Sequence, residues 1–330
     1  MSATMTRTLG RTGLEVSAMG LGCWAIGGVA YRDGRPTGYG SVSDEASIAA
    51  IHRALDLGIT LFDTADVYGA GHSEEVLGRA LAGRRDQAVI ATKFGNTFDE
   101  GQGRLLGQDV SPAYIRRACQ ASLRRLNTDY IDVYQLHVGG VPPAETGPIL
   151  DVLEDLVGEG LIRAYGWSTD DPERALAFAQ RPGCATVQHG MNVFHYDPAM
   201  LALCEAANLA CICRKPLAQG LLSGKYTVGT QMPADDIRSS DASWLVYFKD
   251  GKPSAEWLAK LDALRQVLTS GGRSLVQGAL AWIWGRSERT IPIPGFKTVA
   301  HVEENAAAMA YGPLSAAQLA EIDAILERDT

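Results

Sequence analysis

The sequence predicts a (β/α)₈ barrel of the TIM type, on the basis of three observations. Short apolar or β-branched runs alternate with amphipathic helical patterns along the 330 residues. Such alternation is typical of a parallel sheet that is covered by helices. Eight runs have the length of strands, which is the number that closes such a barrel. No linker or low-complexity segment divides the chain, so we expect a single domain over residues 1–330.

The eight predicted strands follow an N-terminal β-hairpin made by residues 7–9 and 14–16. Each strand is a short run that turn residues or helical patterns enclose. The barrel strands are expected at residues 18–21, 60–63, 88–93, 131–137, 162–168, 185–188, 210–214 and 290–292.

The predicted helices have recognisable ends. Ser43 is placed to cap a helix over 44–57 that Gly58 closes. In Ser111-Pro112 and Asp171-Pro172 a capping residue precedes a proline at the first helical position. Extra C-terminal helices are expected at 255–268, 275–284 and 315–328. The polar stretch 227–253 between the last two strands is long for a loop, and we expect it to form a flap over the active end.

Two glycine-rich segments partly match nucleotide-binding motifs, but each lacks a feature that its motif requires. The run 20–25 has the spacing of a dinucleotide fingerprint, but a glycine-rich loop follows it where that motif requires a helix. The run 220–226 resembles a P-loop but is one residue short between its glycines, and Tyr226 stands where Ser or Thr would bind magnesium. Neither segment therefore indicates an open nucleotide-binding sheet.

Composition excludes several classes of protein. The formal net charge of −8 argues against nucleic acid or an anionic membrane as a partner. We expect no membrane span and no signal peptide. Six cysteines in so long a chain predict reduced thiols and a cytoplasmic location rather than a disulfide framework. We expect no metal site, because the six histidines lack ligand spacing and the Cys211/Cys213 pair has no second pair.

Four polar residues stand at or just beyond the carboxyl ends of consecutive strands. They are Asp63, Tyr68, Lys93 and His137. Each alone would be unremarkable as a cap, a packing residue or a solvated charge. Catalytic groups gather at this face of an α/β barrel, however, so their coincidence predicts an active site.

These four residues fit the reduction of a carbonyl group. Tyr68 can protonate the developing alkoxide, and the Lys93 cation would lower the pKa of the phenol. Asp63 can hold the lysine ionised, and His137 can hydrogen-bond the carbonyl oxygen. None of these groups is placed as a nucleophile, so the expected chemistry is hydride transfer from a nicotinamide.

The segment from Phe62 to Gly69, together with the Lys93 and His137 segments, resembles the aldo-keto reductase superfamily. The similarity extends from Arg7 to about Glu327 and is of the bacterial type, related in pattern to the potassium-channel β-subunit-like reductases. It implies that Asp63, Tyr68, Lys93 and His137 form the catalytic tetrad. It also implies that NADP(H) binds extended across the barrel mouth.

The resemblance further implies which residues bind the cofactor. Cys23 and Trp24 match the loop beside the nicotinamide, and Lys297, before a helix N-terminus, suits a phosphate and favours NADP over NAD. Arg238 is a weaker candidate, from the flap. The other matching positions are Ser168, Thr169, Gln188, Arg214, Pro216, Leu217, Gly220, Leu222, Ser223, Lys225, Gly295, His301, Glu304 and Asn305.

The sequence departs from the family pattern at four places. Thr169 replaces a usual Asn, and His301 replaces a frequent Gln or Arg. Gly139-Gly140 should widen the pocket after His137. Arg214 stands where an aromatic residue commonly stacks on the nicotinamide; it is expected either there or paired with an acidic residue of the flap.

We therefore expect an NADP-dependent oxidoreductase that reduces a small aldehyde, ketone or sugar-like carbonyl to an alcohol. The alternative is a cofactor-binding regulatory protein resembling potassium-channel β subunits, which keep the same tetrad. Turnover of NADPH with carbonyl substrates distinguishes the two.

Overall fold

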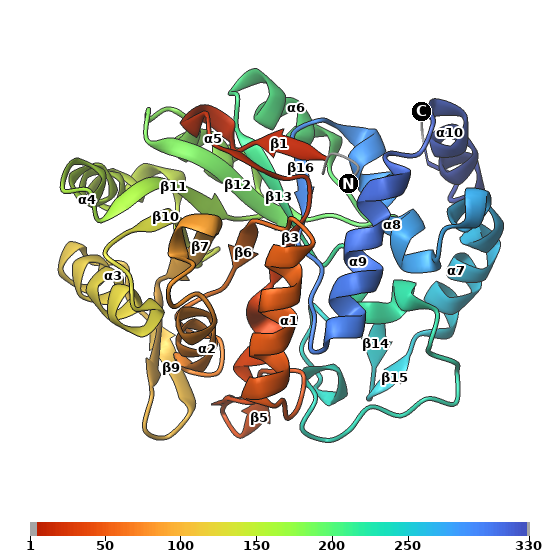
Figure 1. The fold of residues 1–330 in the computed structure, drawn as a ribbon, viewed down its shortest axis with the longest axis horizontal. Coiled ribbons are helices and arrows are strands. Elements are labelled where there is room, and N and C mark those ends of the chain that lie inside the picture. Colours follow the sequence, from red (N-terminus) through yellow and green to blue (C-terminus); the bar gives the residue numbers. More distant parts are fainter. Residues whose placement is uncertain (1–4, 329–330) are drawn as a thin grey trace.

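Eight parallel strands form the centre of the molecule, as the sequence predicts (Figure 1). The computed structural model describes residues 5–328, and its sheet runs in the order β16-β13-β12-β11-β10-β7-β6-β3. A parallel bridge between Gly22 and Gly295, with a hydrogen bond of 3.0 Å from Gly22 N to Pro294 O, joins the last strand to the first. The barrel strands are β3 (Gly20–Gly22), β6 (Leu61–Asp63), β7 (Val89–Phe94), β10 (Ile131–Leu136), β11 (Ile162–Ser168), β12 (Cys184–Gly190), β13 (Ala210–Arg214) and β16 (Thr290–Pro292).

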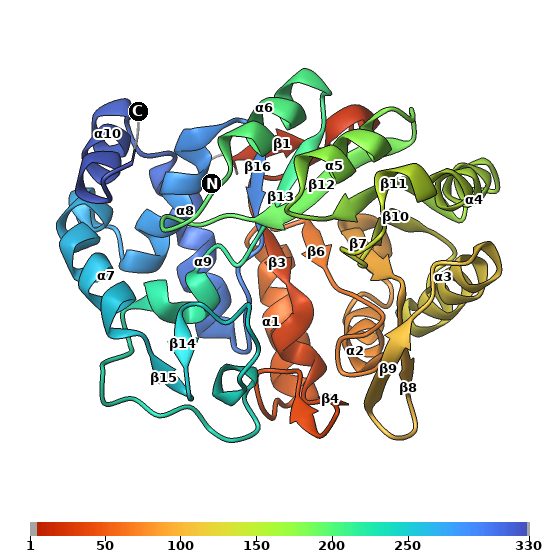
Figure 2. The ribbon, with the colours of Figure 1, turned by 180° about the vertical axis from the view of Figure 1, so that it is seen from behind.

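Helices surround this barrel and contact their neighbours on its outside (Figures 1 and 2). Their caps are those that the sequence indicates: the Ser43, Ser111 and Asp171 side chains each accept a hydrogen bond from a first-turn N–H group. No helix in residues 5–328 has the length and hydropathy needed to cross a membrane. The helices are α1 (Asp44–Asp56), α2 (His72–Ala80), α3 (Pro112–Leu126), α4 (Gly147–Gly158), α5 (Pro172–Ala179), α6 (Pro198–Ala206), α7 (Ala255–Leu268), α8 (Leu275–Arg286), α9 (Val299–Tyr311) and α10 (Ala316–Ile325).

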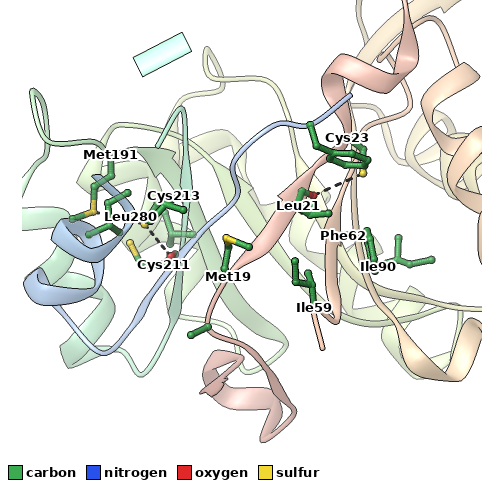
Figure 3. Packing of buried hydrophobic residues seen from close by; sticks show 14 of the residues in the cluster. Met19, Leu21, Cys23, Ile59, Phe62, Ile90, Met191, Cys211, Cys213 and Leu280 are labelled. Carbon is green, nitrogen blue, oxygen red and sulfur yellow. Dashed lines mark hydrogen bonds between the residues drawn. The ribbon is translucent and has the colours of Figure 1, made fainter. Parts of the chain in front are cut away.

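Side chains of the barrel strands alternate between two cores, because successive residues of a strand point to opposite faces. Leu61, Val133 and Ile212 belong to an inner cluster. Their neighbours, such as Phe62 and Tyr134, pack with the helices in a much larger outer cluster, part of which Figure 3 shows. Both faces are thus buried, as expected for parallel strands.

The predicted N-terminal hairpin is present as β1 (Thr6–Thr8) and β2 (Glu15–Ser17). Its Leu9 and Val16 are buried in the inner cluster, together with Leu61 and Ile291 from the barrel strands. The hairpin therefore packs against the interior of the barrel rather than lying free on the surface.

Several short strands extend the loops at the carboxyl ends of the barrel strands. A small sheet has the order β5-β4-β9-β8 and joins the loop after β3 to the loop after β7. The predicted flap is not fully irregular, since a short hairpin ends it. These strands are β4 (Tyr31–Arg32), β5 (Arg35–Pro36), β8 (Asn96–Asp99), β9 (Arg104–Gln108), β14 (Phe248–Lys249) and β15 (Lys252–Pro253).

Candidate active site

A cavity of about 1210 Å³ opens at the carboxyl ends of the barrel strands. Its lining includes three of the four predicted catalytic residues, Asp63, Tyr68 and His137. The volume exceeds that of a pocket for a single drug-sized molecule, so it leaves room for a dinucleotide and a small substrate together.

Lys93 lies at the centre of the candidate site and is fully buried. Its Nζ donates to Asp63 Oδ1 at 2.6 Å and to the carbonyl oxygen of Thr64 at 2.6 Å. It also reaches the hydroxyl of Tyr68 at 3.3 Å. An ammonium group inside a protein requires such partners. Three of the four predicted catalytic residues are therefore joined by hydrogen bonds, with the lysine as the link.

Asp63 is held from the other side by two glutamine amides. Gln188 Nε2 donates to Asp63 Oδ2 at 2.6 Å, and Gln135 Nε2 donates to the same oxygen at 3.2 Å. The family resemblance assigns Gln188 to the cofactor, and Gln135 is not among the predicted site residues. Both are buried polar residues within barrel strands, which is the signal that could have drawn attention to them.

Aromatic rings surround the Tyr68 phenol. Trp24 stacks on the Tyr68 ring with centroids 5.7 Å apart. The His137 ring meets it edge-on at 5.8 Å. His137 directly follows β10 and is half-buried. The fourth predicted residue therefore lies against Tyr68, although it makes no hydrogen bond to the Lys93 group.

Close backbone contact fixes the loop that carries Tyr68. A Cβ atom on Gly69 would lie 1.9 Å from the carbonyl oxygen of Gly27, and Gly69 also has a φ of +60°. Only glycine tolerates this approach. Ser73 Oγ adds a hydrogen bond of 2.8 Å to the carbonyl oxygen of Cys23. The loop after β3 thus positions the phenol that follows β6.

Burial sets the protonation states of the two candidate groups that face a substrate. It raises the pKa of Tyr68, and the opposing effect of Lys93 does not reverse the shift. The expectation of a lowered phenol pKa is therefore wrong in its net direction, because desolvation outweighs the attraction of the cation. Burial, with Lys93 and Arg214 nearby, holds the pKa of His137 well below its ordinary value. At neutral pH the phenol is protonated and the imidazole is neutral.

Most of the residues predicted to bind a cofactor line the same cavity. Those that do are Trp24, Ser168, Gln188, Arg214, Pro216, Leu217, Gly220, Lys225, Arg238, Gly295, Lys297 and His301.

Six of the predicted cofactor residues do not line the cavity. The hydroxyl of Thr169 accepts a hydrogen bond from Asp171 N at 3.1 Å, and that of Ser223 donates to Gly220 O at 2.7 Å. Cys23 and Leu222 are fully buried. Glu304 and Asn305 lie in α9, outside the lining.

Arg214 lines the cavity and is also paired with Asp170. Asp170 lies in the loop after β11, not in the flap, so the acidic partner comes from a different element than expected. The arginine therefore faces the cavity with its charge partly compensated.

A group of polar residues around Gln219 is not among the residues predicted from the sequence. Both amide atoms of Gln219 are buried without a hydrogen-bond partner among the described residues, and the residue lines the cavity. Next to it, Arg238 donates to Gln219 O at 3.1 Å and to Tyr226 OH at 2.5 Å, and forms a two-point ion pair with Asp236. Gln219 has a left-handed backbone conformation, with a φ of 58°. No sequence pattern indicates this conformation, so the position of the Gln219 amide could not be predicted.

Residues of the predicted flap form part of the cavity lining, and the flap meets the loop after β3 there. Ile237 N donates to Gly38 O at 2.7 Å. Lys297 Nζ donates to Tyr39 O at 2.5 Å and to Ser41 O at 3.3 Å. We call these two segments, residues 28–41 and 227–253, the roof. Lys297 thus binds the roof and also lines the cavity.

The fold and the site together define a barrel oxidoreductase with a lysine-linked tyrosine at its mouth. The chain belongs to the aldo/keto reductase family, whose model matches residues 18–327.

Named relatives agree with this assignment. The chain is 32% identical over 337 residues to the NADH-specific methylglyoxal reductase of Escherichia coli, with 97% of this chain and 96% of the relative covered. It resembles the structure of a glycerol dehydrogenase from Gluconobacter oxydans, with a TM-score of 0.81, 33% identity and coverage of 97% and 94%. An aldo/keto reductase from Klebsiella pneumoniae, solved with NADP and acetate, has a TM-score of 0.71, 28% identity and coverage of 99% and 97%.

Proposed function

We propose that this chain reduces a small aldehyde, ketone or sugar-like carbonyl to an alcohol with NADP(H), and that Tyr68 is the general acid. The observation that carries the proposal is the bridge from Asp63 through Lys93 Nζ to the Tyr68 hydroxyl at the cavity mouth. General acid catalysis needs a proton held within reach of the reacting oxygen, and the raised pKa of Tyr68 keeps its phenol protonated at neutral pH.

The residues around the cavity fit an anionic dinucleotide. Gln219 has an amide without a partner in the described chain, and Lys225 and Lys297 bring two cations to the same cavity. Charged and amide N–H groups of this kind are the donors that phosphate and pyrophosphate groups accept from. When bound, NADPH supplies the hydride that carbonyl reduction requires.

Each residue of the tetrad has a distinct part in the proton transfer. Tyr68 gives its phenolic proton to the carbonyl oxygen as negative charge develops there. Lys93 stabilises the phenolate that remains, and Asp63 keeps the lysine charged and oriented. Neutral His137, at the edge of the Tyr68 ring, is placed to orient the carbonyl oxygen.

The preference for NADP over NAD is assigned to Lys297. Its ammonium group lies at the cavity and close to the start of α9. A phosphate accepts a charge-assisted bond there and also benefits from the helix N-terminus. The similar proteins differ in cofactor: the Klebsiella protein was solved with NADP, and the Escherichia coli reductase is NADH-specific. We infer NADP for this chain from Lys297.

A turnover screen tests the proposal. The protein is mixed with small aldehydes, ketones and alcohols in the presence of NADPH, NADH or their oxidised forms, and many turnovers per chain are expected with at least one carbonyl and NADPH. Tight cofactor binding without turnover on any substrate would contradict it. The alternative, a regulatory protein that binds the cofactor, predicts binding without turnover. No observation on this chain favours that alternative, and the similar proteins named above are reductases and a dehydrogenase.

A further inference from the structure

A compact group of sulfur and nitrogen ligands lies outside the barrel mouth. His189, Cys211 and Cys213 bring one imidazole nitrogen and two sulfur atoms within 4.8 Å of one another. All three side chains are buried. The register of β12 and β13 pairs His189 with Cys213, and Cys211 is two residues earlier on the same strand face. From the sequence alone no metal site is expected, because the six histidines lack ligand spacing and the Cys211/Cys213 pair has no second pair.

Two more sulfur atoms adjoin this group. The Sγ of Cys213 lies 3.7 Å from the Sδ of Met191. The thiol of Cys204, on α6, lies beside that of Cys211. Figure 3 shows Cys211, Cys213 and Met191 gathered on the outer side of the sheet, close to Leu280. The ligand group is therefore enclosed by apolar side chains, between two strands and the helix layer.

The hydrogen bonding of His189 is weak for a buried imidazole. Its Nε2 meets Cys211 Sγ at 2.7 Å, and a thiol is a poor donor and a poor acceptor. A buried ring nitrogen usually has a carbonyl, a carboxylate or water as its partner. Because its partner is the sulfur of Cys211 instead, with Cys213 also close by, this nitrogen has the surroundings of a metal ligand.

We propose that His189, Cys211 and Cys213 bind one Zn²⁺ ion, with Cys204 as the candidate fourth ligand. In a tetrahedral zinc site with bonds of about 2.0–2.3 Å, neighbouring ligand atoms are roughly 3.5–3.8 Å apart. The ligand atoms of His189, Cys211 and Cys213 already lie within 4.8 Å of one another, so shifts of about an ångström bring these three to that spacing. Cys204 lies outside this group and would have to move further.

Charge favours a divalent ion at this position. The ligand cysteines lose their protons to water when the ion binds. Zn²⁺ balances the thiolates of Cys211 and Cys213, and a third thiolate from Cys204 would leave one net negative charge. A monovalent ion such as Cu⁺ would leave one negative charge more with the same ligands, which is costlier among apolar side chains. Thioether and thiolate sulfur also suit copper, however, so copper is a separate arm of the test.

The site would act as a cross-link within the fold. It joins β12 to β13 and, through Cys204, to α6. Because its ligands are fully enclosed, the ion is expected to enter while the chain folds rather than afterwards. Two of the ligands are sequence neighbours of cavity residues, since His189 follows Gln188 and Cys213 precedes Arg214. The inference does not depend on the proposed reductase activity.

The first test measures zinc in the protein as isolated. Tag-free protein is produced in zinc-supplemented medium, purified without chelator, and its metal content is measured by mass spectrometry. About one zinc per chain is expected in the wild type and in the matched control Cys119→Ala, which removes a buried cysteine of α3 outside the cluster. Less than a tenth of an equivalent is expected in Cys213→Ser and in His189→Leu.

A second measurement needs no variant, in case those chains fail to fold. Wild-type protein is unfolded with a reductant and a chelator, then refolded with Zn²⁺, with Cu⁺ under anaerobic conditions, or with no metal. The zinc-refolded protein should retain one equivalent after dialysis and unfold at a higher temperature than the metal-free protein. Equal melting temperatures with no retained zinc would overturn the proposal, as would copper retained in its place.

Discussion

Two effects on the Tyr68 phenol oppose each other. Lys93 favours the phenolate, whereas burial favours the protonated form, and burial prevails, so the pKa of Tyr68 is raised. The lysine therefore does not ionise the tyrosine before reaction. Its contribution becomes large only when the proton leaves, since the ammonium group then faces a buried anion.

Replacing Tyr68 by Phe should lower kcat by roughly 10²–10⁴-fold, the usual contribution of a general acid. The ring, its stacking on Trp24 and the surrounding cavity remain, so the dissociation constant for NADPH should change little. Steady-state kinetics and fluorescence titration measure the two quantities. Tyr311→Phe, which removes a phenol from the end of α9, is the matched control and should retain full activity. Near-normal turnover in folded Tyr68→Phe would show that another group is the acid.

His137 should make the protein less stable in mild acid. Its pKa is about 6.5 in the unfolded chain and well below that in the folded protein. Below pH 6.5 the unfolded chain therefore gains a proton that the folded chain does not, and the free energy of unfolding falls as the pH decreases. Above that pH the full stability is present. Urea unfolding at about pH 7.5 and about pH 5 should show a smaller decline for His137→Asn than for the wild type. Equal declines would mean that His137 does not cause the effect.

At the scale of residues, the sequence was sufficient to predict those candidate catalytic residues whose position relative to a strand marks them. Asp63, Lys93 and His137 could be found because each stands at the end of a recognisable strand. The roles of Gln135 and Gln188 could not, since their contact with Asp63 joins side chains 72 and 125 residues away in sequence. Gln219 depends on a left-handed backbone conformation, which Gln does not usually adopt and which no pattern indicates.

Among the elements, the roof has a consequence for the cofactor. Lys297 binds two carbonyl oxygens of the loop after β3, those of Tyr39 and Ser41. The same ammonium group is our candidate for the 2′-phosphate. It would therefore connect the roof and the cofactor, because its Nζ has three donors and the two carbonyls use two.

Lys297→Ala should weaken NADPH binding by roughly tenfold to a hundredfold, as expected for the loss of a charge-assisted bond. NADH lacks the 2′-phosphate, so its dissociation constant should change little. Titrations of both cofactors measure the difference, with Lys249→Ala, an exposed lysine of the flap hairpin, as the control. If NADH binding fell as much as NADPH binding, Lys297 would be acting by holding the roof rather than by recognising phosphate.

Strands and helices differed in how well the sequence predicted them. The barrel strands were found to within a few residues because burial on both faces leaves a continuous apolar run. Capped helices were found from their first residues. The small sheet of β4, β5, β8 and β9 was missed, because its parallel pair joins Tyr31 to Arg104 across a long separation, and glycine-rich loops give no alternation.

For the whole molecule, closure of the barrel depends on glycine at position 22. Gly22 lies where the first and last strands meet, and a Cβ atom there would be 2.9 Å from the carbonyl oxygen of Ile293. Gly22→Ala should therefore reduce the free energy of unfolding by about 1–3 kcal/mol, the usual cost of overpacking. Gly139→Ala is the matched control, since no atom lies within 4 Å of its added methyl group. Urea unfolding of the two variants checks the prediction, and equal stability would contradict it.

The packed N-terminal hairpin closes the amino end of the barrel in the described part of the chain. Leu9 and Val16 fill the amino end of the barrel against Leu61 and Ile291, so the described structure is shaped like a cup and not like a tube. The cavity beside Asp63 and Tyr68 lies at the opposite, carboxyl end, and residues of the roof form part of its lining. A substrate that enters this cavity and a product that leaves it occupy the same space, so product release should set how soon the next substrate can bind.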